Sequence, residues 1–63
     1  MRDLHAMQQI ASEMQRTRLE VIAIPSDRGL SYYLGERQLN GQIVADMIND
    51  GWLRDHGEKL TIS

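Results

Sequence analysis

The sequence contains no cysteine. Disulfide bonds and thiolate metal sites are therefore excluded, and His5 and His56 are too far apart in the sequence to indicate a metal site. We expect neither a metal nor another cofactor. A chain of 63 residues forms at most one domain, over residues 1–63, and buries only about 60% of the surface that it exposes when unfolded. Its stability is expected to be marginal unless it forms a homodimer or binds a partner.

Long apolar runs are missing as well. No segment approaches the roughly 20 apolar residues that a membrane-spanning helix needs. Residues 1–3 lead into a helix interrupted by polar residues, not into the apolar core of a signal peptide. Hydrophobic residues make up 41% of the chain and charged residues 25%, which argues against disorder. We therefore expect a soluble cytoplasmic protein without membrane contacts.

Motifs for catalysis and nucleotide binding are not found either. The sequence has no cysteine nucleophile, no glycine-rich phosphate loop and no set of Ser, His and acidic residues that it places together. A chain this short also leaves little volume for a closed pocket. Asp46 and Asp50 are one helical turn apart, but we expect both on the solvated face of a helix. The sequence therefore predicts that the protein is not an enzyme.

The spacing of the hydrophobic residues changes three times along the chain. Over residues 3–17 they recur every three or four positions, as in an amphipathic helix, and over 19–34 they alternate around a polar turn, as in a hairpin. The helical spacing returns over 39–50 and the alternation over 52–62. The expected fold class is α+β, a small domain in the order helix-hairpin-helix-hairpin. Residues 35–38 are expected to turn or to begin the second helix.

The ends of the predicted helices carry recognisable capping residues. Asp3 and Asn40 are suitable N-caps, and Gly51 can close the second helix in the left-handed conformation, which would place Trp52 against Met47. We expect the two helices to pack on a small antiparallel sheet. The predicted core consists of Leu4, Met7, Ile10, Met14, Val21, Leu30, Tyr32, Leu39, Ile43, Met47, Trp52 and Leu60.

The charge is distributed unevenly between the two halves. Residues 1–30 hold four Arg against two Asp and two Glu, whereas residues 31–63 hold two Arg and one Lys against three Asp and two Glu. The first half is therefore neutral and the second half has a net charge of −2. Nucleic-acid-binding proteins usually present a basic surface, because neutralising phosphates supplies most of their nonspecific affinity. The charge favours a protein partner.

Residues 43–62, with the sequence IVADMINDGWLRDHGEKLTI, resemble the recognition helix and wing of winged-helix DNA-binding domains. The shared pattern is an amphipathic helix, then Gly51, an aromatic residue, a leucine, a polar tip that contains Gly57, and an alternating return strand. The family places two helices before the recognition helix, whereas residues 19–34 of this chain predict strands. The resemblance covers about a third of the chain and implies a winged-helix-like fold and DNA binding.

Two functions remain open. The resemblance implies a small DNA-binding regulator of transcription, in which basic side chains contact phosphates and amides reach base edges. Its DNA-binding residues would be Arg37, Gln42, Asn49, Arg54 and Lys59. The alternative, which the charge favours, is a protein-binding modulator of a host protein, of the kind that phages and mobile elements encode. Its binding residues would be the acidic surface formed by Glu36, Asp46, Asp50, Asp55 and Glu58.

Overall fold

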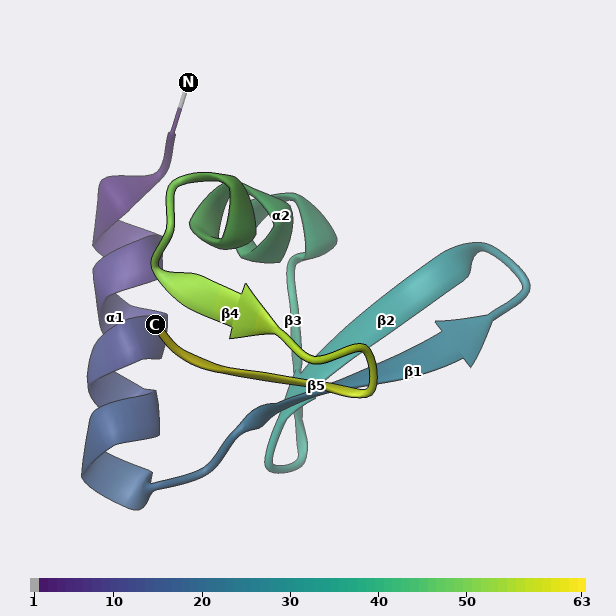
Figure 1. Cartoon of the computed structure of the whole chain (residues 1–63), viewed down its shortest axis with the longest axis horizontal. Helices are drawn as coiled ribbons and strands as arrows, with labels where there is room; N and C mark the ends of the chain where they lie inside the picture. The colour runs from purple at the N-terminus through teal and green to yellow at the C-terminus, as the bar shows by residue number, and fades with distance from the viewer. Residues whose placement is uncertain (1) are drawn as a thin grey trace.

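The structure, a computed structural model, describes residues 2–63. Within this range it is an α+β domain of two helices and a five-stranded antiparallel sheet (Figure 1). The elements follow one another as α1 (Leu4–Thr17), β1 (Val21–Ser26), β2 (Gly29–Leu34), β3 (Arg37–Leu39), α2 (Gly41–Asn49), β4 (Leu53–Asp55) and β5 (Lys59–Ile62). The strands lie in the order β3-β2-β1-β5-β4, so that the first strand is the central one.

Both predicted helices and both predicted hairpins are present, but the expected order lacks one strand. The prediction for residues 35–38 is correct for Gly35 and Glu36, which form a turn, but Arg37–Leu39 forms β3 and pairs with β2, with Leu39 opposite Tyr32. Leu39 therefore belongs to the sheet, and the second helix begins two residues later, at Gly41. The order in the structure is α-β-β-β-α-β-β.

The helix α1 begins and ends with side-chain and backbone caps. The Asp3 carboxylate accepts a hydrogen bond of 3.1 Å from the backbone N–H of Ala6, which confirms the predicted N-cap. At the other end, Arg18 takes the left-handed conformation with φ of 61°, and its N–H donates to the Met14 carbonyl at 2.8 Å. This residue turns the chain away from the helix axis and toward β1.

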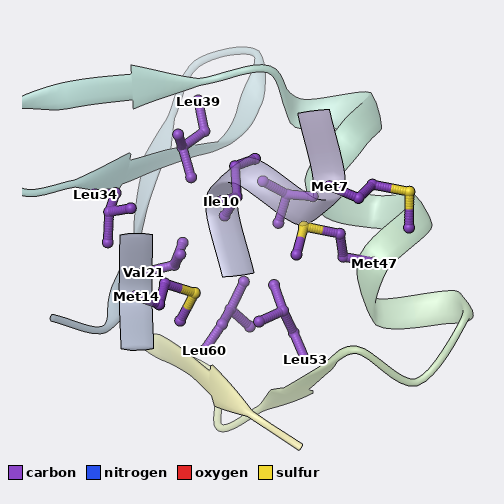
Figure 2. Close-up of a cluster of buried hydrophobic side chains, with 10 residues drawn as sticks. Met7, Ile10, Met14, Val21, Leu34, Leu39, Met47, Leu53 and Leu60 are labelled. Atoms are coloured by element: carbon purple, nitrogen blue, oxygen red, sulfur yellow. The ribbon is translucent and has the colours of Figure 1, made fainter. Parts of the chain in front are cut away.

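The core lies between the two helices and one face of the sheet (Figure 2). In the central pair of strands, Val21 lies opposite Leu60, and both side chains are buried on this face. Side chains of α1 and α2 point toward the same cluster. Both helices therefore cover one face of the sheet, and no described element covers the other. The buried cluster consists of Met7, Ile10, Met14, Val21, Leu34, Leu39, Val44, Met47, Leu53 and Leu60.

Two of the predicted core residues are exposed. Leu4, with 54% of its surface exposed, lies in the first turn of α1. Leu30, at 52%, lies near the tip of the β1–β2 hairpin, which extends beyond both helices in Figure 1. Tyr32, Ile43 and Trp52 are partly buried at the margin of the core. The other seven predicted residues are buried, together with four that were not predicted, Ala23, Leu34, Val44 and Leu53.

Candidate nucleic-acid interface

The helix α2, the candidate recognition helix, begins with a side-chain cap. The Asn40 side-chain oxygen accepts hydrogen bonds from the backbone N–H groups of Gln42, at 2.9 Å, and Ile43, at 3.2 Å. These bonds satisfy two of the N–H groups that the first turn of a helix leaves without a partner. The predicted N-cap is confirmed, and the capping role occupies the Asn40 side-chain oxygen.

The end of α2 forms the turn that leads into β4. Gly51 has a φ of 83°, its N–H donates to the Ile48 carbonyl at 3.2 Å, and the Trp52 N–H donates to the Met47 carbonyl at 2.8 Å. This pair of hydrogen bonds is the Schellman motif, in which a left-handed residue closes the helix. The helix therefore passes directly into the β4–β5 hairpin, with Trp52 packed against the core.

One arginine from the start of the chain binds the side of α2. Arg2 Nη1 donates to Asp46 Oδ1 at 2.9 Å, while its Nε and Nη2 donate to the two carboxylate oxygens of Asp50, each at 3.1 Å. The hydrogen bond to Asp50 and the charges of both carboxylates raise the pKa of Arg2. The last turn of α2 contains no basic residue, so Arg2 supplies the positive charge that this end of a helix dipole favours.

Asp46 does not lie on a solvated polar face, and that prediction is wrong. The residue is 5% exposed. Its Oδ1 accepts a second hydrogen bond, from Gln42 Nε2 at 3.1 Å. A buried carboxylate is tolerated when charged and polar partners replace its hydration, and Arg2 and Gln42 are those partners. Asp46 and Asp50 therefore help to hold residue 2 against α2, and this is their role in the fold.

This arrangement predicts that Arg2→Ala lowers the thermal midpoint of unfolding, because it leaves buried Asp46 without its charged partner. The matched control is Arg16→Ala, which removes the same charge from an exposed position in the last turn of α1. Arg2→Lys should recover part of the loss, since an ammonium group keeps the charge but cannot form the two-pronged contact with Asp50. Thermal unfolding followed by circular dichroism measures the difference. Equal midpoints for the two alanine variants would contradict the prediction.

The predicted DNA-binding residues lie in three places in the structure. Gln42 and Asn49 are exposed on α2, about two helical turns apart on one side. Arg54 follows a buried residue in β4, and Lys59 precedes a buried residue in β5. Because successive side chains of a strand point to opposite faces, both project from the sheet face that the helices leave open. Arg37 lies on β3, at the edge of the sheet farthest from β4. The structure therefore does not bring the five together on one surface.

Carboxylates neutralise two of the three predicted basic residues. Arg37 Nη2 lies 2.8 Å from Glu13 Oε1 of α1, and Lys59 Nζ lies 3.4 Å from Glu20 Oε2. Arg54 forms no ion pair within residues 2–63. Among these three residues, Arg54 is the cation that can bind a phosphate without first releasing a carboxylate.

The acidic residues of the alternative function are also dispersed. Asp46 and Asp50 are bound by Arg2. Glu36 lies in the turn before β3, and Asp55 lies in β4. These two strands are at opposite edges of the sheet. The Asp55 carboxylate also accepts a backbone hydrogen bond within the β4–β5 turn. Asp55 and Glu58, at the two ends of that turn, are what remains of the proposed acidic surface.

An open groove of about 410 Å³ runs along α1. Six of its seven lining residues lie on the polar, solvent-facing side of α1 and the seventh, Arg37, lies on β3, whereas pockets for small molecules are mostly apolar with a few polar groups. The groove therefore does not indicate an active site. It is lined by His5, Gln8, Gln9, Ser12, Glu13, Arg16 and Arg37.

Comparisons with protein-family models, curated proteins and solved structures gave no match for this chain. Within residues 2–63, no group of three or more His, Asp or Glu side chains is arranged to hold a metal ion. In the same range, no helix is both long enough and apolar enough to cross a membrane.

Three residues that are prominent in the structure, Arg2, Ile22 and Ile24, belong to no site or core predicted from the sequence. Arg2 lies 44 positions from Asp46, and no local pattern relates such distant residues. Ile22 and Ile24 are 42% and 47% exposed on the open sheet face, between the inward-facing residues of β1. The consecutive apolar residues of β1 are a signal that could have revealed an apolar outer face.

Proposed function

We propose that this protein is a small, winged-helix-like DNA-binding regulator, with α2 as its recognition helix and the β4–β5 hairpin as its wing. The observation that carries the proposal is the junction between them. The Schellman turn at Gly51 leads α2 through Trp52 into β4 without a linker. Such a junction holds the hairpin in a fixed position relative to the helix. This suits a protein whose helix enters a DNA groove while its hairpin contacts the DNA beside it.

The Arg2 contact supports the proposal because it reduces a charge that opposes DNA binding. Alone, Asp46 and Asp50 would give the side of α2 two negative charges, which phosphates repel. With Arg2 bound to both carboxylates, the three groups together carry a single negative charge. The exposed side of α2 next to them presents the uncharged residues Gln42 and Asn49.

In the proposed complex, each kind of residue has a distinct role. Gln42 and Asn49 would present amide groups to base edges, where Asn and Gln pair with adenine in the major groove. The hydrogen bond to Asp46 orients the Gln42 amide. Arg54, on the edge strand β4, would contact a phosphate. Such a contact positions the protein on the duplex but does not distinguish one DNA sequence from another. Arg37 and Lys59 contribute less, because each already has a carboxylate partner.

We expect Arg54→Ala to weaken binding to mixed-sequence duplex DNA and to reduce the salt dependence of binding. Each phosphate contact contributes about 0.9 to the slope of log K against log salt concentration, so the slope should fall by about 1. Fluorescence anisotropy over a salt series measures it. The matched control is Arg16→Ala, on the exposed side of α1, which changes the net charge equally and should leave the slope nearly unchanged.

The amide residues allow a second measurement. Gln42→Ala with Asn49→Ala should reduce discrimination between DNA sequences and leave the salt slope unchanged, because base contacts release no counterions. The absence of any duplex binding at low salt and micromolar protein, where nonspecific binders already associate, would contradict the proposal. The protein-binding modulator would then be favoured, since the net charge of −2 and the pair Asp55 and Glu58 suit a basic protein partner.

A further inference from the structure

The central strand of the sheet is apolar on both faces. Val21 and Ala23 point into the core, while Ile22 and Ile24 alternate with them and are 42% and 47% exposed. An antiparallel sheet with one solvated face normally presents polar residues there, and a strand that is apolar on both sides is typical of a strand covered on both sides. In this domain, the two helices cover one face of the strand, and no described element covers the other.

The open face has the composition of a protein interface. Tyr33 lies beside Ile22, and Ser31 beside Ile24, across the β1–β2 pair. Toward the edges of the sheet the face becomes polar, with Gln38 on β3 and Arg54 on β4. An apolar centre with a polar rim is the usual anatomy of a protein–protein interface. The small side chain of Ser31 also allows another sheet to approach at the usual spacing of about 10 Å.

The charges on this face indicate a second copy of the chain as its occupant. Glu20 and Lys59 lie side by side, with 3.4 Å between the carboxylate and the ammonium group. A symmetric dimer places the same patch on both subunits, so the patch must be complementary to itself. A face of one sign would repel its copy, whereas a face with adjacent opposite charges can pair Glu20 of each copy with Lys59 of the other.

We propose that two copies of this protein pack face to face through their open sheet faces, with Ile22, Ile24 and Tyr33 at the centre and reciprocal Glu20–Lys59 pairs beside them. The dimer gives the small domain apolar burial that one copy does not have. It does not rest on DNA binding, because α2 lies on the opposite side of the sheet and Arg54 lies on the edge strand β4, at the rim of the open face and outside the proposed centre. The two proposals can therefore fail separately.

The first experiment is sedimentation velocity of the whole chain, without DNA, over a concentration series. We expect a dimer at micromolar concentration. Ile24→Glu should raise the dimer dissociation constant at least about a hundredfold, because the carboxylate would be buried without a partner. The control Leu4→Glu makes a similar change at a residue that is 54% exposed on α1, and it should leave the dimer intact. A monomeric wild-type protein, or a dimer that Ile24→Glu does not weaken, would overturn the proposal.

A charge exchange tests the pairing without relying on Ile24. Glu20→Lys and Lys59→Glu should each weaken self-association by at least about tenfold, because like charges then face each other across the dimer. Mixing the two variants should restore association as a heterodimer, since each copy supplies the charge that the other lacks. Both changes are at exposed positions, so circular dichroism should show that each variant is folded. If the mixture associates no more strongly than the separate variants, the face-to-face arrangement is wrong.

Discussion

Replacing Leu60 by alanine is expected to lower the free energy of unfolding by about 2–5 kcal/mol. Leu60 is 1% exposed and lies opposite Val21, at the point where β5 joins the central strand. A domain of this size has a total stability on the order of 3–9 kcal/mol, so the substitution should remove a large fraction of that stability. Urea denaturation followed by the fluorescence of the single tryptophan, Trp52, measures the change.

The control for this prediction is Leu30→Ala, which removes the same atoms from a residue that is 52% exposed. Because Leu30 leaves no cavity when shortened, its replacement should change the stability by less than about 0.5 kcal/mol. The pair of variants also distinguishes the core in the structure from the core expected from sequence periodicity, which includes both leucines. Equal losses for Leu30 and Leu60 would place the hairpin tip inside a core and contradict the fold.

Gly51→Val is the second substitution with a large expected effect, a loss of about 1–2 kcal/mol. A Cβ at Gly51 would meet no atom within 4 Å apart from its chain neighbours, but the φ of 83° is unfavourable for any residue with a Cβ. The loss therefore comes from the backbone, and it also weakens the turn that leads to Trp52. The thermal midpoint of unfolding measures it.

Gly41 provides the matched comparison for Gly51. It lies in the first turn of α2 with open space around it, and no left-handed φ is required there. Gly41→Ala should leave stability unchanged or raise it by up to about 1 kcal/mol, because alanine favours a helix over glycine. Gly51→Ala should lower it. The same chemical change would then have opposite effects at the two positions. An unaltered thermal midpoint for Gly51→Val would show that the turn at Gly51 does not stabilise the end of α2.

Much of the fold could be predicted from the sequence, because the relevant signals are local. The change from helical spacing to alternation predicts α1, the β1–β2 hairpin, α2 and the β4–β5 hairpin, and Asn40 and Gly51 mark the two ends of α2. The strand β3 was missed because three residues are too few to show a period. Gly35 and Glu36 between Leu34 and Arg37 were the available sign, since a two-residue loop that starts with Gly is a common hairpin turn.

The candidate site was predicted less well, because its geometry depends on contacts between distant residues. The spacing of Gln42, Asp46 and Asp50 places them on one side of a helix, but it does not show that Arg2 will cover that side. Similarly, alternation predicts which face of a strand each residue occupies, yet it does not show which face the helices cover. For this reason the position of Arg54 and Lys59 on the open face could not be predicted from the sequence.

The arrangement of the strands also affects how the chain can assemble during synthesis. The central strand β1 can pair with β2 soon after both leave the ribosome, but its other neighbour, β5, is made only after β3, α2 and β4. Until residue 62 emerges, one edge of β1 remains unpaired, and its apolar residues are accessible to other nascent chains. Exposed apolar edges of this kind promote aggregation. Variants shortened before β5 should therefore accumulate as insoluble protein, even though α1 and the first three strands are complete.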